Sequence, residues 1–97
     1  MSKQMNIGIL GTAKVAEHAM VKAAKSNRDV CIRAVAARDG DKAAAYAARH
    51  GIEHSFSGYQ SLLDRDEIDA VYLPLANHVH EEWAIEALRA GKHVLCE

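Results

Sequence analysis

The chain has 97 residues, 49% of them hydrophobic, which suffices for one domain with its own core. Its formal net charge of −1 excludes the basic surface that nucleic acids and acidic membranes require, so we expect neither as a partner. Cys31 and Cys96 stand in separate apolar runs, which argues against a disulfide framework and for a cytoplasmic location.

Short apolar runs alternate along the chain with segments whose apolar residues recur every three or four positions. The short runs predict buried strands, and the segments of longer period predict amphipathic helices. In chain order we expect a strand at 5–10, a helix at 13–26, a strand at 30–37, a helix at 42–50, a strand at 53–56, a helical turn at 61–64, a strand at 68–73, a helix at 81–90 and a strand at 92–96. Asp41 and Gly51 are expected to cap and to end the helix at 42–50.

This alternation predicts an α/β fold, in which a doubly wound parallel sheet of five strands carries helices on both faces. Two strand orders fit such a chain, and they differ in where the third strand lies. The strand at 53–56 is short and polar, which suits an edge better than a centre. We therefore expect the Rossmann-like order 3-2-1-4-5, with a ligand bound where the first and fourth strands end side by side.

A strand, a glycine and a helix follow one another directly between Ile7 and Ala16. The first backbone N–H groups of such a helix point out of the turn and favour a phosphate there. The loop reads Gly11-x-Ala13-x-x-Ala16, an imperfect version of the dinucleotide fingerprint. A glycine that merely starts a helix is the alternative, and the loop alone does not decide between the two.

Six stretches of the chain carry a resemblance to a known family. They are 7–16 (IGILGTAKVA), 34–39 (AVAARD), 59–63 (YQSLL), 68–72 (IDAVY), 77–80 (NHVH) and 87–97 (ALRAGKHVLCE). In this order they resemble the N-terminal half of the Gfo/Idh/MocA oxidoreductases, named for glucose–fructose oxidoreductase and inositol dehydrogenase. The last stretch is the most specific, because in the family it leads into Glu-Lys-Pro.

The resemblance implies the nicotinamide-dinucleotide-binding part of an oxidoreductase that acts on a sugar, polyol or diol. The residues expected at the cofactor are Gly11, Thr12, Ala13, Lys14, Val15, Ala37, Arg38, Leu75, Ala76, Asn77, His80 and Glu97. In two respects the chain departs from the family: Ala76 replaces the usual proline, and the sequence stops before the catalytic lysine. We therefore expect residues 1–97 to be an incomplete NAD(P)-binding domain without a substrate domain, and we assign no catalytic residue.

Arg38 follows the second strand, where many dinucleotide sites carry an acidic residue for the ribose 2′-hydroxyl. A guanidinium can bind a 2′-phosphate through two parallel hydrogen bonds and can stack on adenine. NADP is therefore expected, with NAD as the second choice, and an exposed arginine paired with Asp39 or Asp41 is the alternative. His78 and His80 could suggest a metal pair, but without a third ligand we expect no metal.

Three functions stay open. The chain could bind the cofactor without being catalytic alone, or it could be a Rossmann fragment that folds and self-assembles without binding a cofactor. A nucleoside binder of the methyltransferase type is the third, against which Arg38 and the stretch 92–97 argue. Because the fifth strand would present an unpaired apolar edge, we also expect a homodimer or a higher homo-oligomer through that edge.

Overall fold

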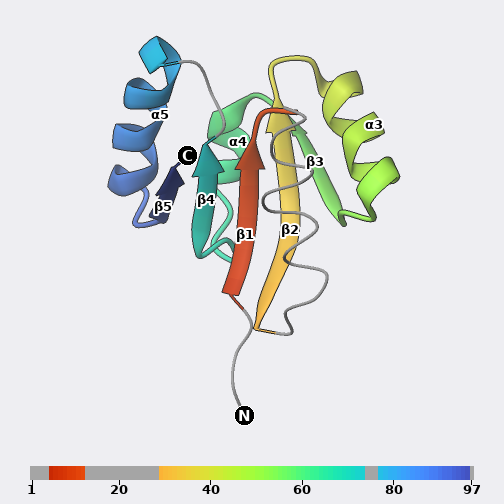
Figure 1. The fold of residues 1–97 in the computed structure, drawn as a ribbon, viewed down its shortest axis with the longest axis horizontal. Helices are drawn as coiled ribbons and strands as arrows, with labels where there is room; N and C mark the ends of the chain where they lie inside the picture. The colour runs from red at the N-terminus through yellow and green to blue at the C-terminus, as the bar shows by residue number, and fades with distance from the viewer. Residues whose placement is uncertain (1–4, 13–28, 74–76, 97) are drawn as a thin grey trace.

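A computed structural model describes residues 5–12, 29–73 and 77–96 of the chain (Figure 1). Its strands form one sheet of parallel strands in the order β3-β2-β1-β4-β5, which confirms the predicted order. The strands are β1 (Met5–Leu10), β2 (Val30–Ala37), β3 (His54–Ser57), β4 (Ala70–Leu73) and β5 (His93–Cys96). β1 and β2 have the predicted bounds, and the other three begin one or two residues later than predicted.

The described part of the chain contains the helices α3 (Gly40–His50), α4 (Tyr59–Leu63) and α5 (Asn77–Arg89). The helix predicted at 13–26 lies outside the described residues. α5 begins four residues before the predicted start, because no glycine or proline interrupts the sequence from 75 to 90. None of these three helices is long and apolar enough to cross a membrane.

The start of α3 corrects one prediction, because Asp39 and not Asp41 caps this helix. The Asp39 backbone is extended, and its carboxylate accepts a hydrogen bond from the backbone N–H of Asp41 at 2.9 Å. Asp41 instead lies in the first turn, where its charge favours the positive end of the helix dipole. The predicted end is confirmed, since Gly51 follows the helix in the left-handed conformation.

Helices cover both faces of the sheet, as predicted, and each face has its own apolar cluster. The cluster on the α3 side contains Ile7, Ile9, Val35, Tyr46, Ala47, Ile52, Ala70 and Tyr72. The cluster on the α4 and α5 side contains Leu10, Ala34, Ala36, Leu62, Leu63, Ile68, Val71, Leu73 and Ala87. Neighbouring residues of β4 alternate between the two clusters, as the pleat of a strand requires. The central strands are therefore buried on both sides.

A β-bulge at Arg33 shifts the alternation of the β2 side chains by one residue. Ile7 of β1 pairs with Ile32, and the next residue of β1 pairs with Ala34, so Arg33 is the extra residue. As a result Ile32 and Val35 both face the α3 side, although they lie three positions apart. The bulge also places the Arg33 side chain at the amino-terminal edge of the sheet.

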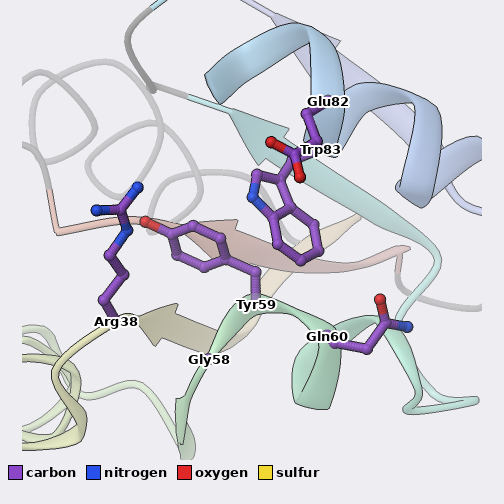
Figure 2. Close-up of a pocket in the computed structure, with 6 residues that line it drawn as sticks. All are labelled: Arg38, Gly58, Tyr59, Gln60, Glu82 and Trp83. Carbon is purple, nitrogen blue, oxygen red and sulfur yellow. The ribbon is translucent and has the colours of Figure 1, made fainter. Parts of the chain in front are cut away.

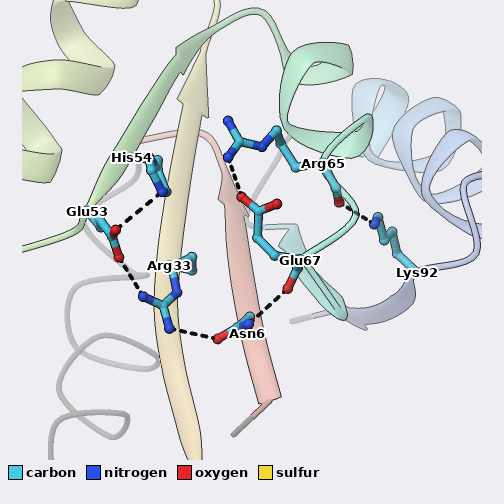
Figure 3. Close-up of polar contacts among 7 residues, drawn as sticks. All are labelled: Asn6, Arg33, Glu53, His54, Arg65, Glu67 and Lys92. Carbon is cyan, nitrogen blue, oxygen red and sulfur yellow. Dashed lines mark hydrogen bonds and ion pairs between the residues drawn. The ribbon is translucent and has the colours of Figure 1, made fainter.

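Polar side chains connect the strands at this amino-terminal edge (Figure 3). Asn6 of β1 donates its side-chain amide to the carbonyl of Glu67 at 2.9 Å and accepts from Arg33 at 3.3 Å. The Nζ of Lys92, which is buried, donates to the carbonyl of Arg65 at 2.6 Å. These contacts join the strands at their amino-terminal edge. They do not involve the carboxyl edge, where a ligand is expected.

Candidate functional site

The strands are parallel, so their carboxyl ends meet at one edge of the sheet. β1 ends at Leu10, and the next residue, Gly11, has a φ of 119°, a conformation that other residues rarely adopt. The backbone N–H of Gly11 donates to the carbonyl of Ala36 at 2.7 Å, which ties the turn after β1 to the end of β2. The turn therefore needs a glycine and lies where the predicted ligand would bind.

The structure describes half of the predicted cofactor residues. At the carboxyl edge Gly11 and Ala37 are buried, Thr12 is half-buried and Arg38 is exposed. Asn77 and His80 lie in the first turn of α5, which follows β4 at the same edge. Outside the described residues lie Ala13, Lys14, Val15, Leu75, Ala76 and Glu97.

Arg38 lines an open pocket of about 370 Å³ (Figure 2), a volume in the range of small-molecule sites. Residues from three elements form its walls: Arg38 follows β2, Gly58, Tyr59 and Gln60 belong to the start of α4, and Glu82 and Trp83 belong to α5. The crossing of the chain from β3 to α4 thus places an aromatic residue beside the end of β2. The pocket joins segments that are far apart in the sequence.

Tyr59 and Trp83 form the aromatic wall of this pocket. Their ring centroids are 5.2 Å apart and their planes meet at 86°, which is the edge-to-face arrangement that aromatic pairs prefer. Both side chains are half-buried, so each holds the other in place while part of its surface faces the pocket. Such a wall suits a flat, apolar ligand group such as a purine ring.

Charged side chains of opposite sign line the pocket, one beside each aromatic ring. Figure 2 shows the guanidinium of Arg38 beside Tyr59 and the carboxylate of Glu82 beside Trp83. Gln60 points away from the pocket, because its side-chain amide donates to Oδ1 of Asp64 at 2.9 Å. The pocket is therefore cationic at one end and anionic at the other.

Arg38 is not the paired surface residue that the alternative interpretation required. Within residues 5–12, 29–73 and 77–96, no carboxylate lies within ion-pair distance of its guanidinium. The nearest acidic residue in sequence, Asp39, uses its carboxylate to cap α3. The guanidinium is thus available to an anionic ligand.

Tyr59, Glu82 and Trp83 were not predicted as site residues. Tyr59 could have been found, because it lies two residues after the end of β3 and parallel strands end at the same edge. Glu82 and Trp83 lie in the second turn of α5, and their place in the pocket depends on how α5 packs beside α4. Among the described residues, no three His, Cys, Asp or Glu side chains converge on a possible metal site.

Comparison with known proteins gives one family and several relatives. Residues 5–97 match the model of the Gfo/Idh/MocA family, described as an oxidoreductase family with an NAD-binding Rossmann fold. An uncharacterized oxidoreductase of Rhizobium meliloti is 46% identical over 93 residues, which are 96% of the chain and 28% of that protein. The dTDP-3,4-didehydro-2,6-dideoxy-alpha-D-glucose 3-reductase of Streptomyces antibioticus is 45% identical over 96 residues, 99% of the chain and 29% of the reductase.

A solved structure has the same fold. It is a 3-ketoreductase from Actinomadura kijaniata in complex with NADP and TDP-benzene, with a TM-score of 0.90 and 38% sequence identity. The match covers 97% of the chain and 29% of the ketoreductase. The chain thus spans less than a third of the length of each of these three proteins.

Proposed function

The chain belongs to the Gfo/Idh/MocA family of oxidoreductases, and on that premise we propose that it binds NADP through the pocket beside β2. The observation that carries the proposal is the Arg38 guanidinium, which lines this pocket without an ion pair to any described residue. A 2′-phosphate would satisfy it with two charge-assisted hydrogen bonds. NAD lacks that phosphate and is the weaker ligand. The NADP bound by the 3-ketoreductase from Actinomadura kijaniata supports this choice.

The described residues fit the adenosine half of such a cofactor. Arg38 holds the 2′-phosphate, the rings of Tyr59 and Trp83 pack against adenine, and the turn at Gly11 brings backbone close to the pyrophosphate. Ala37 and Thr12 lie between these groups. We assign Asn77 and His80, at the start of α5, to the nicotinamide half of the cofactor. When bound, NADP supplies or accepts the hydride of an oxidoreductase.

We propose that the 97 residues bind the cofactor and are not catalytic by themselves. They span 28% to 29% of the relatives, so we expect hydride transfer to require further parts of the protein. For the whole protein we propose hydride transfer between the cofactor and a sugar, polyol or diol, which oxidises an alcohol carbon or, in reverse, reduces the corresponding carbonyl carbon. The sugar-nucleotide 3-reductase among the relatives supports this substrate class.

Calorimetric titration of the chain with NADPH and NADH tests the proposal. We expect tighter binding of NADPH, and we expect Arg38→Ala to lower the affinity for NADPH about tenfold to a hundredfold while hardly changing that for NADH. Arg89→Ala is the matched control, because Arg89 is exposed, pairs with Glu86 and lies outside the pocket.

Two outcomes would contradict the proposal. If neither nucleotide binds below millimolar concentration, the remaining hypothesis is a Rossmann fragment that folds and self-assembles without a cofactor. Displacement of NADPH by S-adenosylmethionine at equal concentration would favour the nucleoside binder of the methyltransferase type.

We further propose that the chain self-associates through β5 and that it works in the cytoplasm. β5 pairs with β4 on one side, and no described residue pairs with its other edge. Such an edge is a ready template for a second strand. Cys31 is a free thiol in the described part of the chain, as is usual for proteins of reducing compartments.

A further inference from the structure

Glu82 is a charged pocket residue to which the proposed cofactor binding gives no role. It is exposed and lines the pocket, and its carboxylate has no hydrogen bond or ion pair with any residue that the structure describes. Among the six lining residues it is the sole acidic one. Of the neighbouring acids on α5, Glu81 does not line the pocket and Glu86 pairs with Arg89 at 3.2 Å.

The two charges of the pocket match the two ends of an adenosine 2′-phosphate. The phosphate at one end of this group is an anion, and the 6-amino group of adenine at the other end is a hydrogen-bond donor. In Figure 2 the cation Arg38 lies beside Tyr59, and the acceptor Glu82 lies beside Trp83. A ligand whose phosphate lies at Arg38 and whose purine packs on Tyr59 therefore directs its 6-position toward Glu82.

We propose that Glu82 accepts a hydrogen bond from the 6-amino group of adenine and thereby selects adenine over purines with a 6-oxo group. This inference rests on the proposed binding of NADP. A carboxylate has only acceptor oxygens, so it matches the amino group of adenine and opposes the carbonyl oxygen of hypoxanthine. It is a specificity-determining residue and takes no part in hydride transfer.

Glu82 is the one described lining residue whose side chain can only accept hydrogen bonds. The aromatic rings of Tyr59 and Trp83 pack equally well on either purine, because both purines are flat and apolar on their faces. The side-chain amide of Gln60, which could otherwise donate to a 6-oxo group, is bound to Asp64. The choice of base at the far end of the pocket therefore falls to Glu82.

The test compares NADPH with its hypoxanthine analogue, reduced nicotinamide hypoxanthine dinucleotide phosphate, by calorimetric titration. We expect the wild-type chain to bind NADPH about threefold to tenfold more tightly, because the hydrogen bond is made at an exposed site. In Glu82→Gln the preference should vanish, because a side-chain amide can accept from the amino group and donate to the oxo group. Trp83, the single tryptophan of the chain, lines the pocket, so its fluorescence gives a second measure of binding.

Glu81→Gln is the matched control, since it makes the same change of charge one residue away and outside the pocket. It should keep the preference for NADPH. Equal affinities of the wild-type chain for both nucleotides, or an unchanged preference in Glu82→Gln, would overturn the inference. An equal gain in affinity for both nucleotides in Glu82→Gln would also overturn it, because Glu82 would then only repel the phosphate groups. NADPH binding that depends on Arg38 but not on the base would sink this inference alone, whereas no NADPH binding would sink the proposed function as well.

Discussion

Arg33 and Arg65 each hold a carboxylate at the amino-terminal edge of the sheet. The guanidinium of Arg33 pairs with Glu53, and its hydrogen bond and charge lower the pKa of that carboxyl below the ordinary value of 4.5. Arg65 lies 2.6 Å from Glu67 and lowers its pKa in the same way, chiefly through the hydrogen bond. Both carboxylates face solvent, so each pair adds little to stability at neutral pH.

The acid sensitivity of the fold is the first prediction at this scale. A carboxyl whose pKa is lower in the folded than in the unfolded chain stabilises the fold above the unfolded pKa, and this stabilisation is lost as the pH falls through the folded pKa. We expect the free energy of unfolding to decrease as the pH drops below 4.5, and Glu53→Gln to flatten part of that decrease. Urea unfolding at neutral pH and at a series of lower pH values measures it.

Glu81→Gln again serves as the control, since no described cation pairs with Glu81, and its pH dependence should match that of the wild type. High salt should weaken the effect of Glu53, because the pair is exposed. The same slope in the wild type and in Glu53→Gln would refute the contribution of the Arg33 pair.

At the scale of elements, β1 and α4 meet at Gly8. A Cβ placed on Gly8 would lie 2.5 Å from Cδ2 of Leu62, a side chain that is fully buried. The glycine of β1 therefore makes the room in which α4 packs on the sheet. The position of α4 in turn places Tyr59 in the pocket, so a packing residue supports the candidate site.

A double-mutant cycle tests this close approach. Gly8→Ala should destabilise the fold by about 1–3 kcal/mol through overpacking. Leu62→Ala alone should cost about 2–5 kcal/mol through the cavity it leaves. In the double variant the new methyl group occupies part of that cavity, so the summed cost should be less than additive in urea unfolding. Strictly additive losses would show that the two residues do not meet.

The sequence predicts elements better than it predicts contacts between them. The bounds of β1 and β2 were predicted correctly because these strands are rich in apolar and β-branched residues. The polar character of residues 53–56 correctly predicted that β3 lies at the edge of the sheet. The bulge at Arg33 was not predicted, because in the sequence it appears only as a change in alternation. Glu82 and Trp83 escaped prediction because helix periodicity reports which face is buried and not which neighbour it meets.

At the scale of the whole molecule, self-association is predicted by the edge of β5 with which no described residue pairs. We expect sedimentation equilibrium at micromolar concentration to give a dimer or a larger assembly. His93 donates its N–H to Asp69 beside β4, so the N–H of Val94 points toward the free edge. The Val94 amide should therefore exchange its hydrogen more slowly as the concentration rises. A clean monomer whose Val94 amide exchanges at one rate at all concentrations would rule out pairing through this edge.

The central place of β1 has a consequence for synthesis of the chain. β1 precedes the other described strands along the chain, but its partners are residues 30–36 of β2 and 70–72 of β4. During translation this apolar strand leaves the ribosome long before β4, so the middle of the sheet stays open until residue 73 has emerged. The nascent chain thus carries β1 without its β4 partner until then, and an unpaired apolar strand of this kind is a segment that chaperones can shield.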